Sequence, residues 1–168
     1  SCDEPCQGAR AGPPWNPPFD ESMSGQIPAA LRRLVFERAA GLCEYCLIHQ
    51  SDAHFTFPVD HIISRKHQGA TKAANLALAC LRCNVTKGTD VGALIGRPRR
   101  LSRLYHPRKD DWRAHFHLAG ARIVPVSDVG EATVRLLDLN ARDRLMLRRA
   151  LARAGRYPSL EALAYLRG

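Results

Sequence analysis

The stretch that decides the fold is CLRCNVTK, Cys80–Lys87, because it repeats the cysteine spacing of CEYC, Cys43–Cys46. A C-x-x-C pair in a turn presents two thiolates to one ion, and two such pairs complete a tetrahedral four-sulfur site that favours zinc. Four protein ligands leave no position for water, so we expect a structural Zn²⁺. Its predicted ligands are Cys43, Cys46, Cys80 and Cys83. Buried free cysteines or a redox dithiol are the alternative, but both pairs would then have to arise without a shared purpose.

The segment between the two cysteine pairs carries an acid and a histidine side by side. Its 33 residues exceed the loop of a compact zinc ribbon, so we expect an inserted element there. Within it, PVDHI (Pro58–Ile62) is rich in β-branched and apolar residues, which is typical of a strand. Neighbouring side chains on a strand point to opposite faces, so Asp60 and His61 do not simply pair with each other. Each needs a role of its own.

The order of the polar residues around this strand is the most specific feature of the chain. Taken singly they have ordinary structural explanations, such as a turn Asp, a half-buried His or a capping Asn. Their joint order resembles the HNH endonuclease family, whose ββα-metal motif has C-x-x-C, a D-H-I strand, N-L and then C-x-x-C-N-x-x-K. The corresponding segments are CEYC, VDHI, NLALAC and CLRCNVTK, within residues 38–88. More weakly, LYHPRKDDWRAHF and GEATVRLLDLN look like the downstream segment of a bacterial HNH subgroup.

The resemblance implies an α+β fold. We expect a small ββα-metal (His-Me finger) core with the zinc site, flanked by an N-terminal helix and a basic C-terminal helical extension. The predicted division is an irregular or disordered, proline-rich arm over residues 1–26, the nuclease core over 27–96 and the extension over 97–168. Composition becomes more ordinary after Met23, so residues 1–22 are expected to lie upstream of the functional unit, and Cys2 and Cys6 then need no role.

The resemblance also implies a chemistry, which is metal-dependent hydrolysis of DNA phosphodiester bonds to 5′-phosphate and 3′-hydroxyl ends. Asp60 and Asn84 would hold the catalytic cation, Mg²⁺ or Mn²⁺. His61 would act as general base, since a neutral imidazole accepts a proton near pH 7. Asn75 would orient the loop beneath the strand, and Lys87 would contact phosphate or support the site.

Three departures from the family pattern bear on these roles. Asn84 stands where a His is common, which makes this an HNN variant, and its amide oxygen is still a suitable ligand for a hard cation. The loop that usually ends in Gly-Gly is HQGAT here, which would alter loop geometry. Glu131 replaces an expected Arg, which would alter DNA contacts.

Apolar spacing and end signals predict the remaining elements. They are a helix over Pro28–Ala40, strand structure over Phe55–Ile63 that forms a hairpin bending near Asp60 and His61, a helical turn in NLALAC, a helix beginning within CNVTKGTDVGALIG, and helices over Glu131–Leu139, Ala141–Ala154 behind an Asn140 cap, and Leu160–Arg167 behind Ser159.

The net charge of +9 lies entirely in the second part of the chain. Residues 1–96 contain 9 Lys and Arg against 9 Asp and Glu, whereas residues 97–168 contain 16 against 7. A basic segment beside a neutral one suits a nucleic-acid binder, and we expect double-stranded DNA as the partner. Candidate phosphate contacts form one stripe of a helix, with Leu147, Leu151 and Ala154 on a different face: Arg142, Arg149, Arg153 and Arg156. An ordinary solvated helix face is the alternative.

Two other functional classes compete with the nuclease. The runner-up is a zinc-stabilised nucleic-acid-binding module without catalysis, which would be expected to lose at least one of Asp60, His61 and Asn84. A zinc protein that mediates protein contacts explains the cysteines but leaves the other motif residues to coincidence. The sequence has no apolar run of membrane-spanning length and no signal-peptide pattern, so a cytoplasmic location is expected. Cutting both strands with one site per chain requires a homodimer or two successive nicks.

Overall fold

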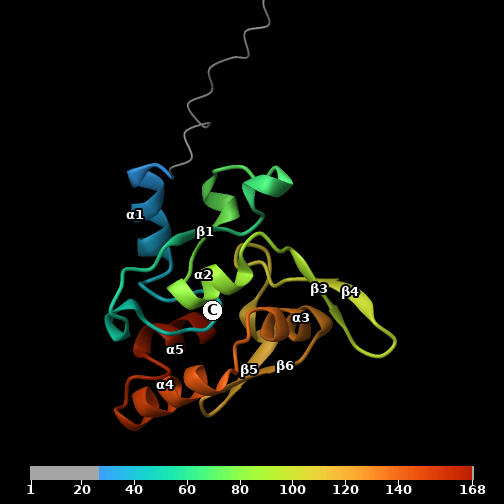
Figure 1. The fold of residues 1–168 in the computed structure, drawn as a ribbon. Helices are drawn as coiled ribbons and strands as arrows, with labels where there is room; N and C mark the ends of the chain where they lie inside the picture. Colours follow the sequence, from blue (N-terminus) through green and yellow to red (C-terminus); the bar gives the residue numbers. More distant parts are fainter. Residues whose placement is uncertain (1–26, 168) are drawn as a thin grey trace, which may run out of the picture.

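A computed structural model describes residues 27–167, and the predicted arm over residues 1–26 lies outside them. The fold is α+β, with short two-stranded antiparallel sheets and helices packed around them (Figure 1). In chain order the helices and strands are α1 (Ala29–Arg38), β1 (Val59–His61), β2 (Leu76–Leu78), α2 (Leu81–Lys87), β3 (Gly92–Ile95), β4 (Arg100–Arg103), β5 (Phe116–Ala119), β6 (Arg122–Pro125), α3 (Asp128–Leu136), α4 (Arg142–Arg153) and α5 (Leu160–Arg167). The predicted fold class is therefore confirmed.

The ββα unit consists of β1, β2 and the short helix α2 that follows them. Strands β1 and β2 are antiparallel, and Asp60 faces Ala77 across the ladder. Helix α2 begins at the second cysteine pair, where Cys80 Sγ accepts a hydrogen bond from the Cys83 N–H at 3.4 Å. It ends at Gly88, whose φ of 52° lies in the left-handed region that glycine tolerates. In Figure 1, β1 crosses directly beside α2.

Two expectations about this unit are wrong. The predicted hairpin does not turn at Asp60 and His61: β1 covers only Val59–His61, it begins after Pro58, which has no N–H to extend the ladder, and its partner strand follows the loop of residues 62–75. NLALAC is not helical, because Leu76–Leu78 pairs with β1. All three of these residues are buried, so the segment lacks the polar alternation that identifies a half-buried strand.

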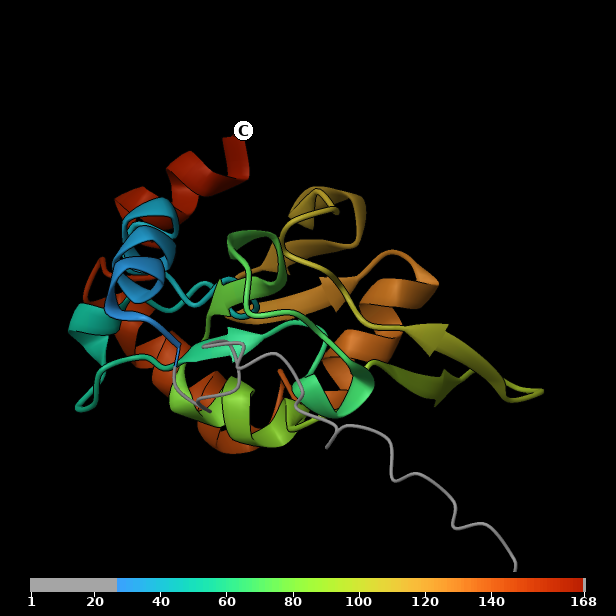
Figure 2. The ribbon, with the colours of Figure 1, turned by 90° about the horizontal axis from the view of Figure 1, so that it is seen from above.

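Two hairpins that the sequence patterns did not predict follow the ββα unit. The chain leaves α2 at Lys87 and then forms β3, which pairs with β4; β5 pairs with β6 in the same way. The first hairpin projects from the rest of the molecule in both views (Figures 1 and 2). The residues after 96 are therefore not only helical, and the boundary expected between 96 and 97 falls inside a hairpin.

One hydrophobic core joins the ββα unit to the later elements. Its buried residues extend from Val35 in α1 to Ala162 in α5. Hydrogen bonds also connect the later elements to the cysteine turn: Trp112 Nε1 donates to the Tyr45 carbonyl at 3.3 Å, and the Tyr157 hydroxyl donates to the Cys46 carbonyl at 3.2 Å. The C-terminal part is thus packed against the cysteine turn.

A buried ion pair also fixes the cysteine turn. Glu44 is 1% exposed and accepts a hydrogen bond from the Leu78 N–H at 2.9 Å, which joins the turn to β2. Its other carboxylate oxygen pairs with Arg108, from the segment between β4 and β5. Because both side chains are largely withdrawn from solvent, each depends on the other for charge compensation.

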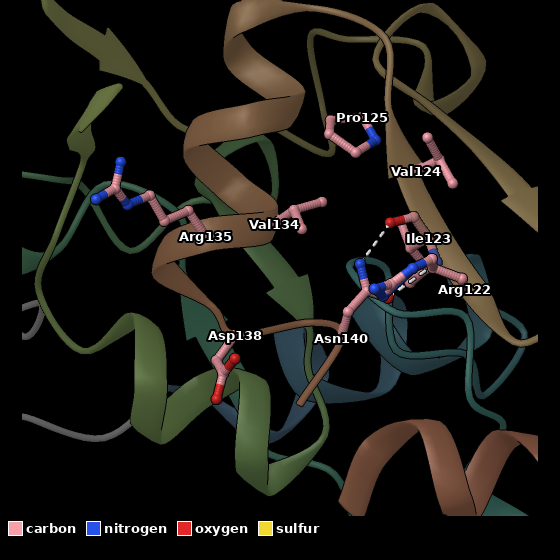
Figure 3. Close-up of a pocket in the computed structure, with 8 residues that line it drawn as sticks. All are labelled: Arg122, Ile123, Val124, Pro125, Val134, Arg135, Asp138 and Asn140. Carbon is pink, nitrogen blue, oxygen red and sulfur yellow. Dashed lines mark hydrogen bonds between the residues drawn. The ribbon is translucent and has the colours of Figure 1, made fainter. Parts of the chain in front are cut away.

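The three C-terminal helices form with small shifts from their predicted bounds. Ser159 accepts a hydrogen bond at the start of α5, as expected, whereas α3 begins earlier than predicted, behind a cap by Ser127. Asn140 does not cap α4. Its side chain instead accepts a hydrogen bond from the Ile123 N–H at 3.0 Å and donates to the Ile123 carbonyl at 2.7 Å, which holds β6 beside the chain that leaves α3 (Figure 3).

The Glu44 pair predicts an asymmetry between two arginine substitutions. Arg108→Met leaves the Glu44 carboxylate buried without its cation and should lower the free energy of unfolding by about 3 kcal/mol. Arg113→Met removes a pair with Asp111 in which both side chains are more than half exposed, and should cost less than about 1 kcal/mol. Urea unfolding followed by circular dichroism measures both. Equal effects of the two substitutions would contradict a stabilising role for the buried pair.

Candidate metal centre and nuclease site

The four cysteines of the two C-x-x-C pairs converge on one point. Their sulfur atoms all lie within 4.8 Å of one another, and the Cys46 and Cys80 sulfurs are 3.8 Å apart. This separation is far longer than a disulfide bond, and all four cysteines are free and buried. A zinc ion with bonds of about 2.3 Å to four sulfurs would place them about 3.8 Å apart. The cluster fits a zinc site, and the convergence of both pairs favours a metal over two separate dithiols.

Asp60 lies inside the molecule, on the face of β1 that points toward the cysteine turn. It is 6% exposed. Its Oδ2 accepts a hydrogen bond from the Tyr45 hydroxyl at 2.9 Å, and Lys87 Nζ lies 3.1 Å from the same oxygen and 3.3 Å from Oδ1. Burial raises the pKa of Asp60, while Lys87 and Tyr45 oppose the rise. Burial also raises the pKa of Tyr45 well above its usual value, so Tyr45 remains a donor.

Lys87 is buried, with 1% of its surface exposed. In addition to contacting Asp60, its Nζ donates to the His61 carbonyl at 3.0 Å. The ammonium thus connects the end of α2 to two successive residues of β1. Of the two roles expected for Lys87, these contacts favour support of the site over contact with phosphate.

His61 projects from the opposite face of β1, and its ring contacts the loop that joins the two strands. Nε2 lies 2.9 Å from Thr71 Oγ1, and the side chain is only half buried. With the proton on Nε2, the ring donates to Thr71 and leaves the Nδ1 lone pair free. Burial lowers the pKa of His61, and the nearby Arg65 and Lys87 lower it further against the effect of Asp60. The imidazole is therefore neutral at pH 7 and able to accept a proton.

Asn75 connects the two ends of the same loop. Its Oδ1 accepts from the Ile63 N–H, and its Nδ2 donates to the carbonyls of Ile63 and Ala70, at distances of 2.9 to 3.0 Å. Gly69 allows this closure, since a Cβ there would lie 1.8 Å from the Ile63 carbonyl oxygen. Gly69 of HQGAT therefore provides the space that this close approach requires. Gln68, the residue before it, adopts the left-handed backbone conformation. Asn75 holds the loop that carries Thr71.

Asn84 lies one turn before Lys87 on α2 and is half buried. Residues three apart on a helix share a face, so Asn84 lies on the same side of α2 as the lysine that contacts Asp60. Within residues 27–167 no hydrogen bond engages its side-chain amide. This leaves the Asn84 amide oxygen available as a ligand.

A known protein family matches the segment of the chain that contains these residues. Residues 43–90 match the family model described as HNH endonuclease. The resemblance to the HNH endonuclease family is confirmed over these residues. The HNH match begins at the first cysteine and ends just after α2, so it contains all of the cysteine ligands and the whole ββα unit. Neither the curated proteins nor the solved structures gave a match.

The proposed DNA-contacting arginines lie outside the HNH match, on and after α4. Arg142, Arg149 and Arg153 are exposed. Arg156 is ion-paired with Asp52 and also donates to the Ser51 carbonyl at 3.3 Å. The face of α4 turned toward the core carries arginines: Arg144 and Arg148 are the buried residues of the helix, whereas Leu147 is 43% exposed.

Several residues of the site were not found by sequence reasoning. Tyr45 and Thr71, which contact Asp60 and His61, lie in a turn and a loop where no periodic pattern marks them. The one signal in the sequence was the position of Tyr45 between the two cysteines of CEYC. Glu131, which departs from the family pattern, accepts a hydrogen bond from the Gly96 N–H at 3.4 Å and so lies against the first hairpin.

Other features of the described structure lie away from this site. A cavity of about 440 Å³ lies between α3 and β6 and is lined by Val134, Arg135 and Asn140 among others (Figure 3). None of the candidate HNH residues lines it. Within residues 27–167, no helix combines the length and the apolar character needed to cross a bilayer.

The cysteine cluster predicts that the fold depends on zinc and does not depend on magnesium. Replacing Cys43 and Cys80 together by Ala should abolish zinc binding and unfold the core, because structural zinc contributes folding free energy directly. Omitting Mg²⁺ should leave the fold intact. Far-UV circular dichroism and zinc content by atomic absorption measure both effects.

The matched control replaces Cys2 and Cys6 by Ser, because these two cysteines are not among the predicted zinc ligands. Its spectrum and zinc content should equal those of the wild type. An intact fold in the Cys43 and Cys80 double variant would contradict a structural metal.

Proposed function

We propose that the protein is a metal-dependent HNH endonuclease that hydrolyses phosphodiester bonds in DNA. The observation that carries this proposal is the arrangement of β1 against α2. Lys87 contacts the Asp60 carboxylate and the His61 backbone carbonyl, one turn after Asn84, so β1 and α2, which carry the three motif residues, meet at Lys87. The HNH match over the same residues supports the assignment.

The residues at this junction suit a hard divalent cation. Asp60 Oδ1 accepts only the long Lys87 contact at 3.3 Å among residues 27–167, and a carboxylate oxygen has a second lone pair. The Asn84 amide supplies another neutral oxygen, and Mg²⁺ and Mn²⁺ prefer such ligands. We assign the cation to Asp60 and Asn84. When bound, it would neutralise charge on the scissile phosphate and lower the pKa of a coordinated water.

The chain's own groups would then carry out the proton transfer and the positioning. His61 accepts a proton at Nδ1 from the water that attacks phosphorus, while Thr71 holds Nε2 and Asn75 fixes the loop that carries Thr71. The bond between phosphorus and the 3′ oxygen breaks, the 3′ oxygen takes a proton from solvent, and the phosphate remains on the 5′ end. Lys87 keeps the Asp60 carboxylate and the His61 backbone in place.

A binding module without catalysis is the second candidate, and one observation favours it. Tyr45 and Lys87 already satisfy the Asp60 carboxylate in a nearly solvent-free position. An Asp held in this way can serve as a structural anchor for α2. The two candidates share the zinc site and the nucleic-acid partner, and they differ in whether the chain turns over substrate.

Nicking of supercoiled plasmid in Mg²⁺ distinguishes the two candidates. Wild-type protein should convert supercoiled DNA to the open-circular form, and both His61→Ala and Asn84→Ala should be slower. Loss of a general base is expected to cost about 10² to 10⁴ in rate. Gel analysis of single-turnover time courses measures the rates.

His117→Ala is the matched control, because it removes an exposed histidine from β5, away from the ββα unit. It should nick at the wild-type rate. Absence of metal-dependent nicking, or equal nicking by His61→Ala, would favour the binding module.

We further propose that the exposed arginines of α4 contact the phosphates of duplex DNA. Arg142, Arg149 and Arg153 are spaced by seven and four residues, which places them along one helix face. No carboxylate of residues 27–167 is ion-paired with them. Phosphate contacts of this kind supply affinity without sequence preference.

Salt dependence tests the proposed arginine contacts directly. The triple variant Arg142→Gln, Arg149→Gln, Arg153→Gln should bind duplex DNA more weakly, and the slope of log K against log salt should fall by about 0.9 for each phosphate that the protein no longer neutralises. Fluorescence anisotropy across a salt series measures the slope. Arg113→Gln, on a different segment, should leave it unchanged. An unchanged slope in the triple variant would indicate an ordinary solvated helix face.

A further inference from the structure

Two buried arginines on α4 face the cysteine cluster, although the HNH match ends far before this helix. Arg144 is 5% exposed and Arg148 is fully buried, and they lie four residues apart on one face of the helix. Within residues 27–167, neither forms an ion pair with a carboxylate. A buried guanidinium without a counter-charge is strongly unfavourable, so the structure needs an anion close to them.

The contacts of Arg144 identify that anion. Its Nη2 donates to Cys83 Sγ at 2.8 Å, and its Nη1 donates to the Leu137 carbonyl at 2.8 Å. The fork of the guanidinium therefore joins a cysteine of the cluster to the end of α3. Zinc with four thiolates carries a net charge of minus two, which is the counter-charge that the buried arginines lack.

Arg148 lies on the same side of the cluster but does not touch a sulfur. It donates to the carbonyls of Ala121 and Leu139, and its guanidinium carbon lies 5.9 Å from the ring centre of Tyr157. The hydroxyl of Tyr157 in turn donates to the Cys46 carbonyl. Arg148 thus adds a second buried positive charge on this side of the cluster, but it makes no hydrogen bond to a cysteine sulfur.

We propose that Arg144 is a positioning residue of the metal centre, donating a charge-assisted hydrogen bond to the Cys83 thiolate and compensating the charge of the zinc tetrathiolate. Partners of this kind orient metal ligands and tune their affinity. The zinc site would then be completed by the C-terminal helices, and zinc binding would be coupled to the docking of α4. The proposal rests on zinc binding by the four cysteines and is independent of catalysis.

Zinc affinity in a small set of variants tests this role. Competition with a chromophoric chelator at neutral pH measures affinity, after atomic absorption has established the zinc content of wild-type protein. Arg144→Met keeps the bulk of the side chain and removes the charge and the donor, so zinc affinity should fall by about 10-fold to 100-fold. Arg144→Lys keeps the charge without the fork and should give an intermediate loss. Arg149→Met, on the exposed face of the same helix, should bind zinc as the wild type does.

A spectroscopic readout separates a contact with sulfur from a general effect on folding. In Co²⁺-substituted protein, loss of the hydrogen bond to Cys83 should shift the thiolate-to-cobalt charge-transfer band to lower energy in Arg144→Met but not in Arg149→Met.

Three outcomes would overturn the proposal. They are equal zinc affinity in Arg144→Met and the wild type, an equal loss in Arg149→Met, and failure of both Arg144 variants to fold at saturating zinc, which would make the residue a packing element only. Wild-type protein without bound zinc would overturn the zinc assignment itself, and nicking activity would remain a separate question.

Discussion

The convergence of four cysteine sulfurs is the constraint on which the rest of the structure depends. Each C-x-x-C turn also carries a group that the candidate active site uses. CEYC contains Tyr45, which donates to Asp60, and the second pair opens α2, which brings Lys87 to the same carboxylate. A single ion at the sulfurs would therefore fix two elements that are far apart in sequence, and β1 lies between them. The cysteine cluster and the geometry of the candidate site are consequences of the same local fold.

The alternation of side chains on β1 gives its two polar residues different surroundings. Asp60 is enclosed by Tyr45 and Lys87, whereas His61 faces the loop and meets Thr71. Burial shifts the pKa of each group toward its neutral form, upward for the acid and downward for the histidine. For His61 the neutral form is the one that accepts a proton. For Asp60 the negative charge is compensated by the buried Lys87 ammonium, which lies 3.1 Å from its carboxylate.

The sequence predicts the parts of the molecule that local pattern controls. Cysteine spacing and the order of the motif residues predict the metal cluster and the ββα class, and apolar spacing with end signals such as Ser159 predicts α1, α3, α4 and α5. Leu76–Leu78 was assigned to a helix because full burial removes the alternation of a strand. The burial of Arg144 and Arg148 on α4 follows no local sequence rule, because their contacts are made with residues of other elements. The contacts of Tyr45 and Thr71 are likewise set by tertiary packing.

The central claim is that one metal ion bound by four sulfurs holds this arrangement together, and X-ray absorption at the zinc edge of the purified protein tests it most directly. The account predicts stoichiometric zinc with four sulfur ligands at about 2.3 Å. Fewer than four sulfurs, nitrogen or oxygen in the first coordination sphere, or folded protein without zinc would contradict it.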